Sequence, residues 1–179
     1  LDAKLCDGTG VVNLTFNPDF GQAESDEVIV NFSAQETFYS EKRAFFNENQ
    51  SLFDLSHYDR YRVINTRRIG AASTYDCQAS SDENRCDGKR KSYTDIDFAL
   101  RYTQKNDNSN VGIFVAQESD ESFTKGKNFY AIRSKNKIGT RTIGYFLTHV
   151  VDNFTNEKAT VNVIDFINVK SDKLTLYTD

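Results

Sequence analysis

From Tyr93 onward the chain alternates apolar and polar residues over stretches of about eight to ten residues, and this pattern constrains the fold most strongly. Successive side chains of a β-strand point to opposite faces, so the alternation predicts half-buried strands. Clusters of Asn, Asp, Gly, Ser and Lys separate the stretches and suit the turns of an antiparallel meander. The predicted strands are Asp95–Gln104, Val111–Glu118, Asn128–Ser134, Arg141–Asp152, Ala159–Val169 and Lys173–Asp179.

The two faces of these strands differ in composition. In Asp95–Gln104 the apolar face carries Ile96, Phe98, Leu100 and Tyr102, and the other face is mixed. The strand that begins at Arg141 shows the same division. We therefore expect a sheet with one apolar face and one mixed face.

The first ninety residues are less regular. Val11–Phe16 and Glu27–Phe32 are predicted as two strands of a hairpin, because the residues Asn17–Gly21 between them contain Pro and Gly and suit a turn. Gln35–Asp54 is rich in Phe and in charged residues, but its apolar residues match neither the 3.6-residue period of a helix nor the two-residue period of a strand. An ordered irregular segment with a short helical turn is expected there. With the two strands of the predicted hairpin and the six after Tyr93, the whole chain is predicted to contain about eight strands.

Composition and charge narrow the class of protein. The net charge is −4 and the pI is near 5.3, which argues against a nucleic-acid partner. Aromatic residues make up 13% of the chain and are all Tyr and Phe, a bias that suits strands. No apolar run approaches the roughly 20 residues of a membrane-spanning helix. The start has no initiator Met and no signal-peptide pattern, so we expect a mature chain or an excised piece.

The connections and the tyrosines point to one architecture within the all-β class. Lys105–Asn110, Lys135–Thr140 and Lys170–Asp172 are short, whereas Ser119–Lys127 and the region before Tyr93 are longer. Outer-membrane β-barrels show this asymmetry between their two ends. An up-and-down antiparallel meander that forms part of such a barrel, or resembles one, is therefore predicted. Tyrosines near strand ends form either an interfacial girdle or ordinary cross-strand pairs: Tyr102, Tyr130 and Tyr177.

Three cysteines bear on the compartment and on domain organisation. Cys77 and Cys86 bracket a polar loop, and a disulfide between them would close a ring of about ten residues, worth on the order of 2–3 kcal/mol. Such a bond implies an oxidising compartment, and free surface thiols are the alternative. Cys6 is left without a partner. Residues 1–179 are predicted as a single β-rich domain, a fragment of a larger barrel, with a polar loop insertion at 73–92.

Three short motifs resemble those of one family: Asn17-Pro18-Asp19-Phe20-Gly21-Gln22-Ala23-Glu24-Ser25-Asp26, Glu41-Lys42-Arg43-Ala44-Phe45-Phe46 and Arg67-Arg68-Ile69-Gly70. Their order and spacing resemble the domain of unknown function family 5916, a Gram-negative outer-membrane β-barrel region that usually follows a carbohydrate-binding-like domain. The chain departs from the family at Ala44, where proline is usual, and at Thr66, where serine is more typical. The resemblance implies location and architecture, but no reaction.

One cluster of side chains is a candidate for ligand binding. Guanidinium and phenol groups together can bind carboxylates, phosphates or sugar rings, so the cluster is a candidate pore-lining or lipopolysaccharide-contacting patch. The default interpretation is that these groups pair with the many carboxylates of the same chain. The cluster consists of Tyr58, Arg60, Tyr61, Arg62, Arg67 and Arg68.

Other reactive residues give weaker signals. His57 and His149 have no neighbours at metal-ligand spacing, and no Gly-x-Ser-x-Gly motif is present. Ser81–Gly88 offers oxygen ligands without the ligand series of a calcium loop, so a solvated loop is expected. The acidic tip of Glu118, Asp120 and Glu121 is interpreted in the same way. No catalytic residue, metal or cofactor is predicted.

The sequence therefore favours a non-enzymatic outer-membrane β-barrel segment. Its partners are expected to be outer-membrane lipid and a solute or surface ligand of a carbohydrate-related kind. A soluble, disulfide-clamped β-sandwich that binds a glycan or a protein through a Tyr-rich face is the alternative. An enzyme, with glycoside hydrolysis as its chemistry, is the third hypothesis.

Overall fold

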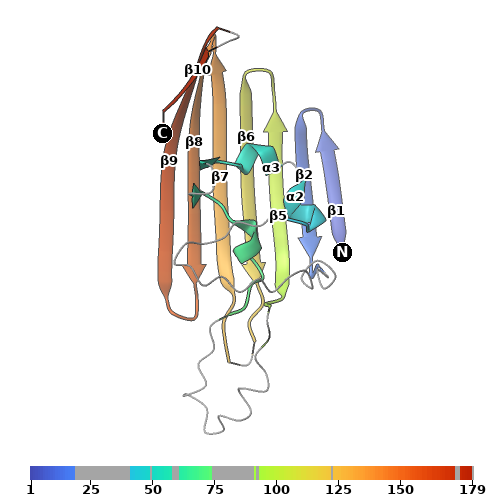
Figure 1. Cartoon of the computed structure of the whole chain (residues 1–179). Helices are drawn as coiled ribbons and strands as arrows, with labels where there is room; N and C mark the ends of the chain where they lie inside the picture. The colour runs from blue at the N-terminus through green and yellow to red at the C-terminus, as the bar shows by residue number, and fades with distance from the viewer. Residues whose placement is uncertain are drawn as a thin grey trace.

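Eight strands form the main sheet of the computed structural model, which describes residues 1–18, 41–48, 50–57, 61–73, 91, 93–121, 123–171 and 174–178. The strands are β1 (Asp2–Asp7), β2 (Gly10–Phe16), β5 (Ile96–Lys105), β6 (Ser109–Glu118), β7 (Lys127–Ile138), β8 (Arg141–Asp152), β9 (Glu157–Ser171) and β10 (Leu174–Thr178). Their spatial order is β1-β2-β5-β6-β7-β8-β9-β10, and every neighbouring pair is antiparallel (Figure 1). The described sheet is open, with β1 and β10 as its edges.

The connections at the two ends of the sheet differ in length. At one end two or three residues join β1 to β2, β5 to β6, β7 to β8 and β9 to β10. Two of these turns use glycines at positive φ, Gly8 at +54° and Gly139 at +62°. At the other end the links are residues 17–95, 119–126 and 153–156 (Figure 1). The predicted alternation of short and long connections is confirmed.

The sequence pattern located most of these strands. The predicted Arg141–Asp152 has the bounds of β8, and the other strands after Tyr93 differ from prediction by a few residues at their ends. The hairpin predicted for Val11–Phe16 is wrong, because β2 pairs with β1 on one side and with β5 on the other. Glu27–Phe32 lies outside the described residues. Strand β1 was not predicted, although a two-residue turn joins it to β2 in a regular antiparallel register.

A run of short elements lies across one face of the sheet (Figure 1). It comprises α2 (Ala44–Asn47), α3 (Gln50–Phe53), β3 (Ser56–His57), β4 (Tyr61–Arg62) and the 3-10 helix η1 (Thr66–Arg68). We call residues 41–73 the covering segment, the sheet face beneath it the covered face, and the opposite face the open face. The expected irregular segment with a helical turn is confirmed for the described part of Gln35–Asp54. None of the described helices has the length and apolar character to span a membrane.

The core lies between the covering segment and the covered face. Aromatic rings form much of this core. The ring centroid of Phe53 lies 6.4 Å from that of Phe114 and 6.3 Å from that of Phe146. Gly112 permits this approach, since a Cβ there would lie 2.6 Å from Phe53 Cζ. The buried apolar residues are Phe46, Leu52, Phe53, Ile69, Ile96, Ala99, Phe114, Ala116, Ala131 and Phe146.

One core residue comes from an irregularity in β5. The pairing of β5 with β6 shifts its register between Ile96 and Phe98, as expected for a β-bulge. Ile96 is consequently buried in the core, whereas Phe98 and Leu100 keep the expected alternation. The prediction that Ile96 shares a face with Phe98 is therefore wrong, because the extra residue at the bulge reverses the alternation.

The open face carries a continuous row of apolar side chains across neighbouring strands, which we call the apolar belt. In soluble proteins such a face is normally buried, yet Ile132 is 44% exposed and Ile164 is 68% exposed. The register of the strands places the belt residues on one face. They are Leu5, Val12, Leu14, Phe16, Phe98, Leu100, Tyr102, Val111, Ile113, Val115, Tyr130, Ile132, Ile143, Tyr145, Leu147, Ile164 and Phe166.

Candidate functional site

A buried ion pair joins two of the motifs that are distant in sequence. Arg43 Nη2 donates to Glu41 Oε2 at 2.8 Å and to the Thr66 carbonyl at 2.7 Å, and its Nη1 donates to the Ile69 carbonyl at 2.7 Å. Thr66 Oγ1 donates to Glu41 Oε2 at 2.7 Å. The Arg43 guanidinium also lies 4.2 Å from the centroid of the Phe46 ring. We call Glu41, Arg43, Thr66 and Ile69 the latch.

The latch has a clear electrostatic signature. Burial opposes ionisation of the Glu41 carboxyl, but the hydrogen bonds and charge of Arg43, with the hydrogen bond from Thr66, outweigh it. The pKa of Glu41 therefore lies below its ordinary value. Thr66 fills the serine position of the family pattern with its hydroxyl retained. The latch residues hold one another and the backbone, so their role is to fix the covering segment.

Charged residues on the covered face of the sheet form hydrogen bonds and an ion pair with the covering segment. Gly70, at φ +81°, donates its backbone N–H to Glu118 Oε1 at 2.8 Å. Arg101 donates to the Phe45 carbonyl and pairs with Glu48 at 3.2 Å. Glu118 is buried, so its interpretation as part of a solvated acidic tip is wrong. It tethers the Arg67-Arg68-Ile69-Gly70 motif to the sheet.

The Glu48 carboxylate binds three side chains from the strands nearest the N-terminus: Lys4 on β1, Asn13 on β2 and Arg101 on β5. Lys4 donates to Glu48 Oε1, and Asn13 Nδ2 donates to Glu48 Oε2 at 2.9 Å. The hydrogen bond and charge of Lys4 are the main reason why the pKa of Glu48 lies below its ordinary value. The end of α2 is thereby attached to β1 and β2 as well as to Arg101 on β5.

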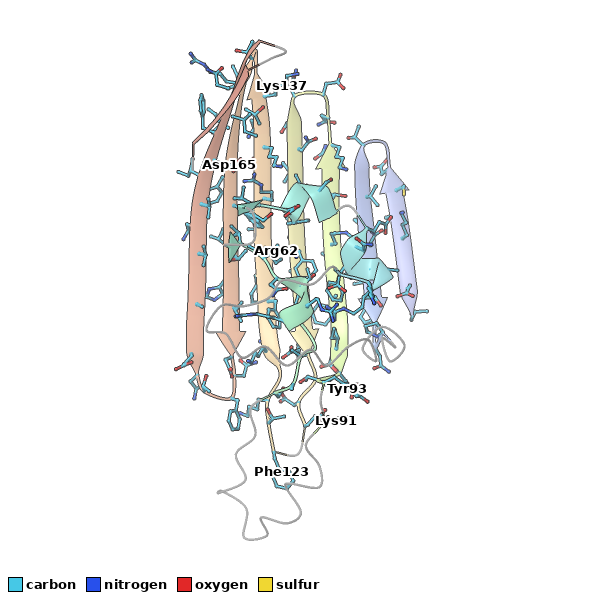
Figure 2. The ribbon with its side chains drawn as sticks, viewed as in Figure 1. Arg62, Lys91, Tyr93, Phe123, Lys137 and Asp165 are labelled. Carbon is cyan, nitrogen blue, oxygen red and sulfur yellow. The ribbon has the colours of Figure 1, made fainter. Side chains whose placement is uncertain are left out.

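A second buried ion pair lies wholly within the covered face of the sheet. Arg133 on β7 donates through Nη1 and Nη2 to the two carboxylate oxygens of Asp165 on β9, the latter bond at 2.9 Å. Both side chains are buried, and the Arg133 guanidinium lies 5.3 Å from the Phe146 ring centroid. Figure 2 labels Asp165 on β9. Sequence reasoning missed this pair.

The arginine and tyrosine cluster is only partly described. Tyr58 and Arg60 lie outside the described residues, and Tyr61 is described only as a backbone position of β4. Arg62 is half-buried in a groove that Arg68 also lines, and Figure 2 labels Arg62 on the covering segment. Arg62 and Arg67 also line a small enclosed space together with Glu41, Glu48 and Asp54. The structure thus places Arg62 beside Arg67 in one space and beside Arg68 in the other.

Several other predicted features lie outside the described residues. These are Cys77 and Cys86, the loop Ser81–Gly88, most of the polar insertion 73–92, and the motif residues from Asp19 to Asp26. Asn17 and Pro18 are described at the end of β2, where Asn17 adopts a positive φ of 41°. Cys6 is a free, exposed thiol on β1.

The histidines differ in how far the structure describes them. His149 lies on the open face, where its Nδ1 is 2.7 Å from Thr160 Oγ1 and its ring centroid is 6.0 Å from that of Tyr130. His57 belongs to β3, and its side chain is not described. Within the described ranges, no group of three or more His, Cys, Asp or Glu residues could hold a metal.

The charged residues that sequence reasoning missed share one signal. Arg101, Arg133 and Asp165 each lie on the covered face of their strand, two residues after Ala99, Ala131 and Val163 respectively. A charge at such a position, repeated on several strands, marks a polar sheet face. The alternation of residues alone identifies that face only as mixed.

Comparison with known proteins agrees with the motif resemblance. Neither the curated proteins nor the solved structures contain a significant match to the chain. The family model described as "Domain of unknown function (DUF5916)" matches residues 11–173, which include the latch, both buried ion pairs and every residue of the apolar belt except Leu5. The chain belongs to this family, DUF5916.

Proposed function

We propose that the chain is part of the wall of an outer-membrane β-barrel, with its open face toward lipid and its covered face toward the barrel interior. The observation that supports this proposal most strongly is the distribution of apolar and charged side chains between the open face and the covered face of the sheet. The exposed face holds the apolar belt, whereas the covered face holds Arg101, Glu118, Arg133 and Asp165. A sheet in water has the reverse preference, because burial of apolar surface drives folding.

The position of the apolar belt along successive strands supports a tilted sheet in a membrane. The hydrogen-bonded row that contains Leu14 on β2 reaches Thr160 on β9. The belt residues of β9 are Ile164 and Phe166, so the belt shifts by about five residues over five strand-to-strand steps. With about 3.3 Å per residue and about 4.8 Å between strands, this slope equals a tilt of about 35°. Transmembrane β-barrels have strand tilts of about 35–45°.

The two ends of the sheet support an orientation. Outer-membrane barrels have short turns on the periplasmic side and longer loops outside. The turn after β1 and the turn after β7 would therefore be periplasmic. The covering segment belongs to the longest connection, residues 17–95, so it would enter the barrel interior from the external side.

Polar atoms on the covered face support a hydrated interior. Arg101 Nε, Arg133 Nε, Asn13 Oδ1 and Thr15 Oγ1 are buried and have no hydrogen-bond partner within the described chain. Burying such groups without partners costs free energy, and ordered water in a polar lumen would satisfy them. The role that fits this interior is passage or binding of a solute, without covalent chemistry.

Fractionation of cells that express the full-length protein tests the proposal. We expect the protein in the outer-membrane fraction, with gel mobility that changes on heating because a barrel resists SDS until boiled. Recovery of a monomer in the periplasmic fraction, stable in buffer without detergent, would contradict the proposal. That outcome would favour a soluble protein that uses the apolar belt to bind a partner.

A further inference from the structure

Two lysines of β7 lie on the covered face, at the end of the sheet where the turns are short. Lys135 and Lys137 alternate with Arg133 along β7, so all three side chains are on the same side of the sheet. Figure 2 labels Lys137 near the β7–β8 hairpin. Lys137 is exposed, whereas Lys135, one step further from the hairpin, is half-buried. The two ammonium groups therefore follow one another from the hairpin end into the sheet.

Neither ammonium is neutralised by a contact within the described part of the chain. Among the described residues, no side-chain hydrogen bond or ion pair is made by either lysine. Asp165 on β9 and Asp54 of the covering segment attract Lys135 without contacting it, and Arg133 repels it. Asp165 already accepts two hydrogen bonds from Arg133, and Asp54 accepts one from Ser56 Oγ at 3.2 Å. Lys135 and Lys137 are consequently left as excess positive charge on this part of β7.

The residues that pair with the two lysines on the neighbouring strands carry no charge. Asn110 of β6 and Gly144 of β8 flank Lys135, and Thr142 of β8 pairs with Lys137. A half-buried ammonium in this position has lost part of its hydration without gaining a counter-ion in contact, which costs free energy. An anion beside this part of β7 would supply that counter-ion.

The spacing and chemistry of the lysines suit passage of an anion better than tight binding. Residues two apart on a strand lie about 6.6 Å apart, so an anion can move from one ammonium to the next. Lysine carries a compact charge with rotatable donors and lacks the planar fork by which arginine holds a carboxylate. Conduction requires binding strong enough to favour entry and weak enough to permit exit.

We propose that the solute of the barrel is an anion, and that Lys135 and Lys137 select it and pass it along β7. This inference rests on the proposed function, because it requires the covered face to line a lumen. Lys137 would meet the anion at the hairpin end of the lumen. Lys135 would bind it next, at a half-buried position where salt screens the charge less.

Recording the current through the purified full-length protein in planar lipid bilayers tests the inference, with chloride and potassium as the probe ions. With about 0.1 M KCl on one side and about 0.01 M on the other, exposed charges are weakly screened, and we expect the wild type to pass chloride in preference to potassium. K135Q/K137Q should lower the ratio of chloride to potassium permeability by about twofold or more. K135R/K137R retains both charges and should keep the wild-type ratio.

Lys158→Gln is the matched control. Lys158 is exposed on the open face of β9, so this variant removes the same charge from the opposite side of the sheet and should keep the ratio. Heat-modifiable gel mobility checks that each variant is folded.

The outcomes separate this inference from the barrel proposal. A wild type that prefers potassium, an unchanged ratio in K135Q/K137Q, or an equal fall in K158Q would overturn the inference and leave the barrel wall standing. Outer-membrane protein that carries no current would also overturn the inference alone. A periplasmic location in the cell fractionation would overturn the barrel wall itself.

Discussion

Arg133 on β7 and Asp165 on β9 meet across the strand that separates them, because the intervening residue on β8 is Gly144. The register pairs Gly144 directly with Asp165. A Cβ on Gly144 would lie 2.2 Å from Asp165 Oδ1, and the carboxylate cannot retreat while both its oxygens accept hydrogen bonds from Arg133. The glycine thus makes room for an ion pair that spans three strands of the covered face.

The first prediction concerns this glycine. Gly144→Ala should lower the free energy of unfolding by about 3 kcal/mol or more, because the methyl group displaces one partner of a buried ion pair. Denaturant unfolding of the purified chain measures the change. Gly10→Ala is the matched control, since its added Cβ would have no neighbour closer than 3.4 Å, and it should change stability by less than about 1 kcal/mol. Equal losses in the two variants would contradict this role for Gly144.

The second prediction concerns the apolar belt. Ile132→Arg, in the middle of the belt, should destabilise the inserted protein by about 2–4 kcal/mol, whereas Ile138→Arg should cost about 0–1 kcal/mol. Both residues lie on the open face of β7 and both are exposed, but Ile138 is at the hairpin end. Lipid makes the cost depend on depth, whereas water would leave both substitutions nearly neutral. Unfolding in lipid vesicles, with outer-membrane yield in cells, distinguishes the two cases.

Strands were predictable because their information is local. Each of the strands after Tyr93 carries its own alternation, and turn residues such as Gly139 mark where it ends. Two predictions about the sheet were wrong because they depend on more than one strand. Strand β2 pairs with β5, which lies more than eighty residues away in the sequence, and one extra residue at the bulge in β5 moves Ile96 into the core. The alternation within a single strand reveals neither the pairing partner nor the bulge.

The site was less predictable for a related reason. The motifs that contain Arg43 and Ile69 were visible, but the sequence does not show that the guanidinium of one binds the carbonyl of the other. Likewise, the pattern separated an apolar face from a mixed face without saying which one is covered. The covering segment determines which face is covered, and the sequence of this irregular segment follows neither the helical nor the strand period.

The third prediction concerns the fork of hydrogen bonds in the latch. Arg43→Lys retains the charge but cannot bind Glu41 and the carbonyls of Thr66 and Ile69 together, so it should lower the free energy of unfolding by about 2–4 kcal/mol. Limited proteolysis should also cut the covering segment faster. Arg141→Lys is the control, because Arg141 is exposed at a hairpin. If both variants behave like the wild type, the latch does not fix the covering segment.

The last prediction follows from the lowered pKa of Glu41. Folding favours the ionised carboxylate, so Glu41 adds its full stabilisation above its ordinary pKa of 4.5, and this contribution is lost as the pH falls through the lower pKa of the folded state. Glu41→Gln leaves the buried Arg43 without its counter-ion and should cost about 3–5 kcal/mol at pH 7. The gap between wild type and variant should therefore narrow as the pH falls below about 4.5. Unfolding midpoints measured from pH 7 to pH 3 give the profile, with the exposed Glu157→Gln as control. A gap that stays constant, or widens in acid, would show that the Glu41 carboxylate does not stabilise the latch through its charge.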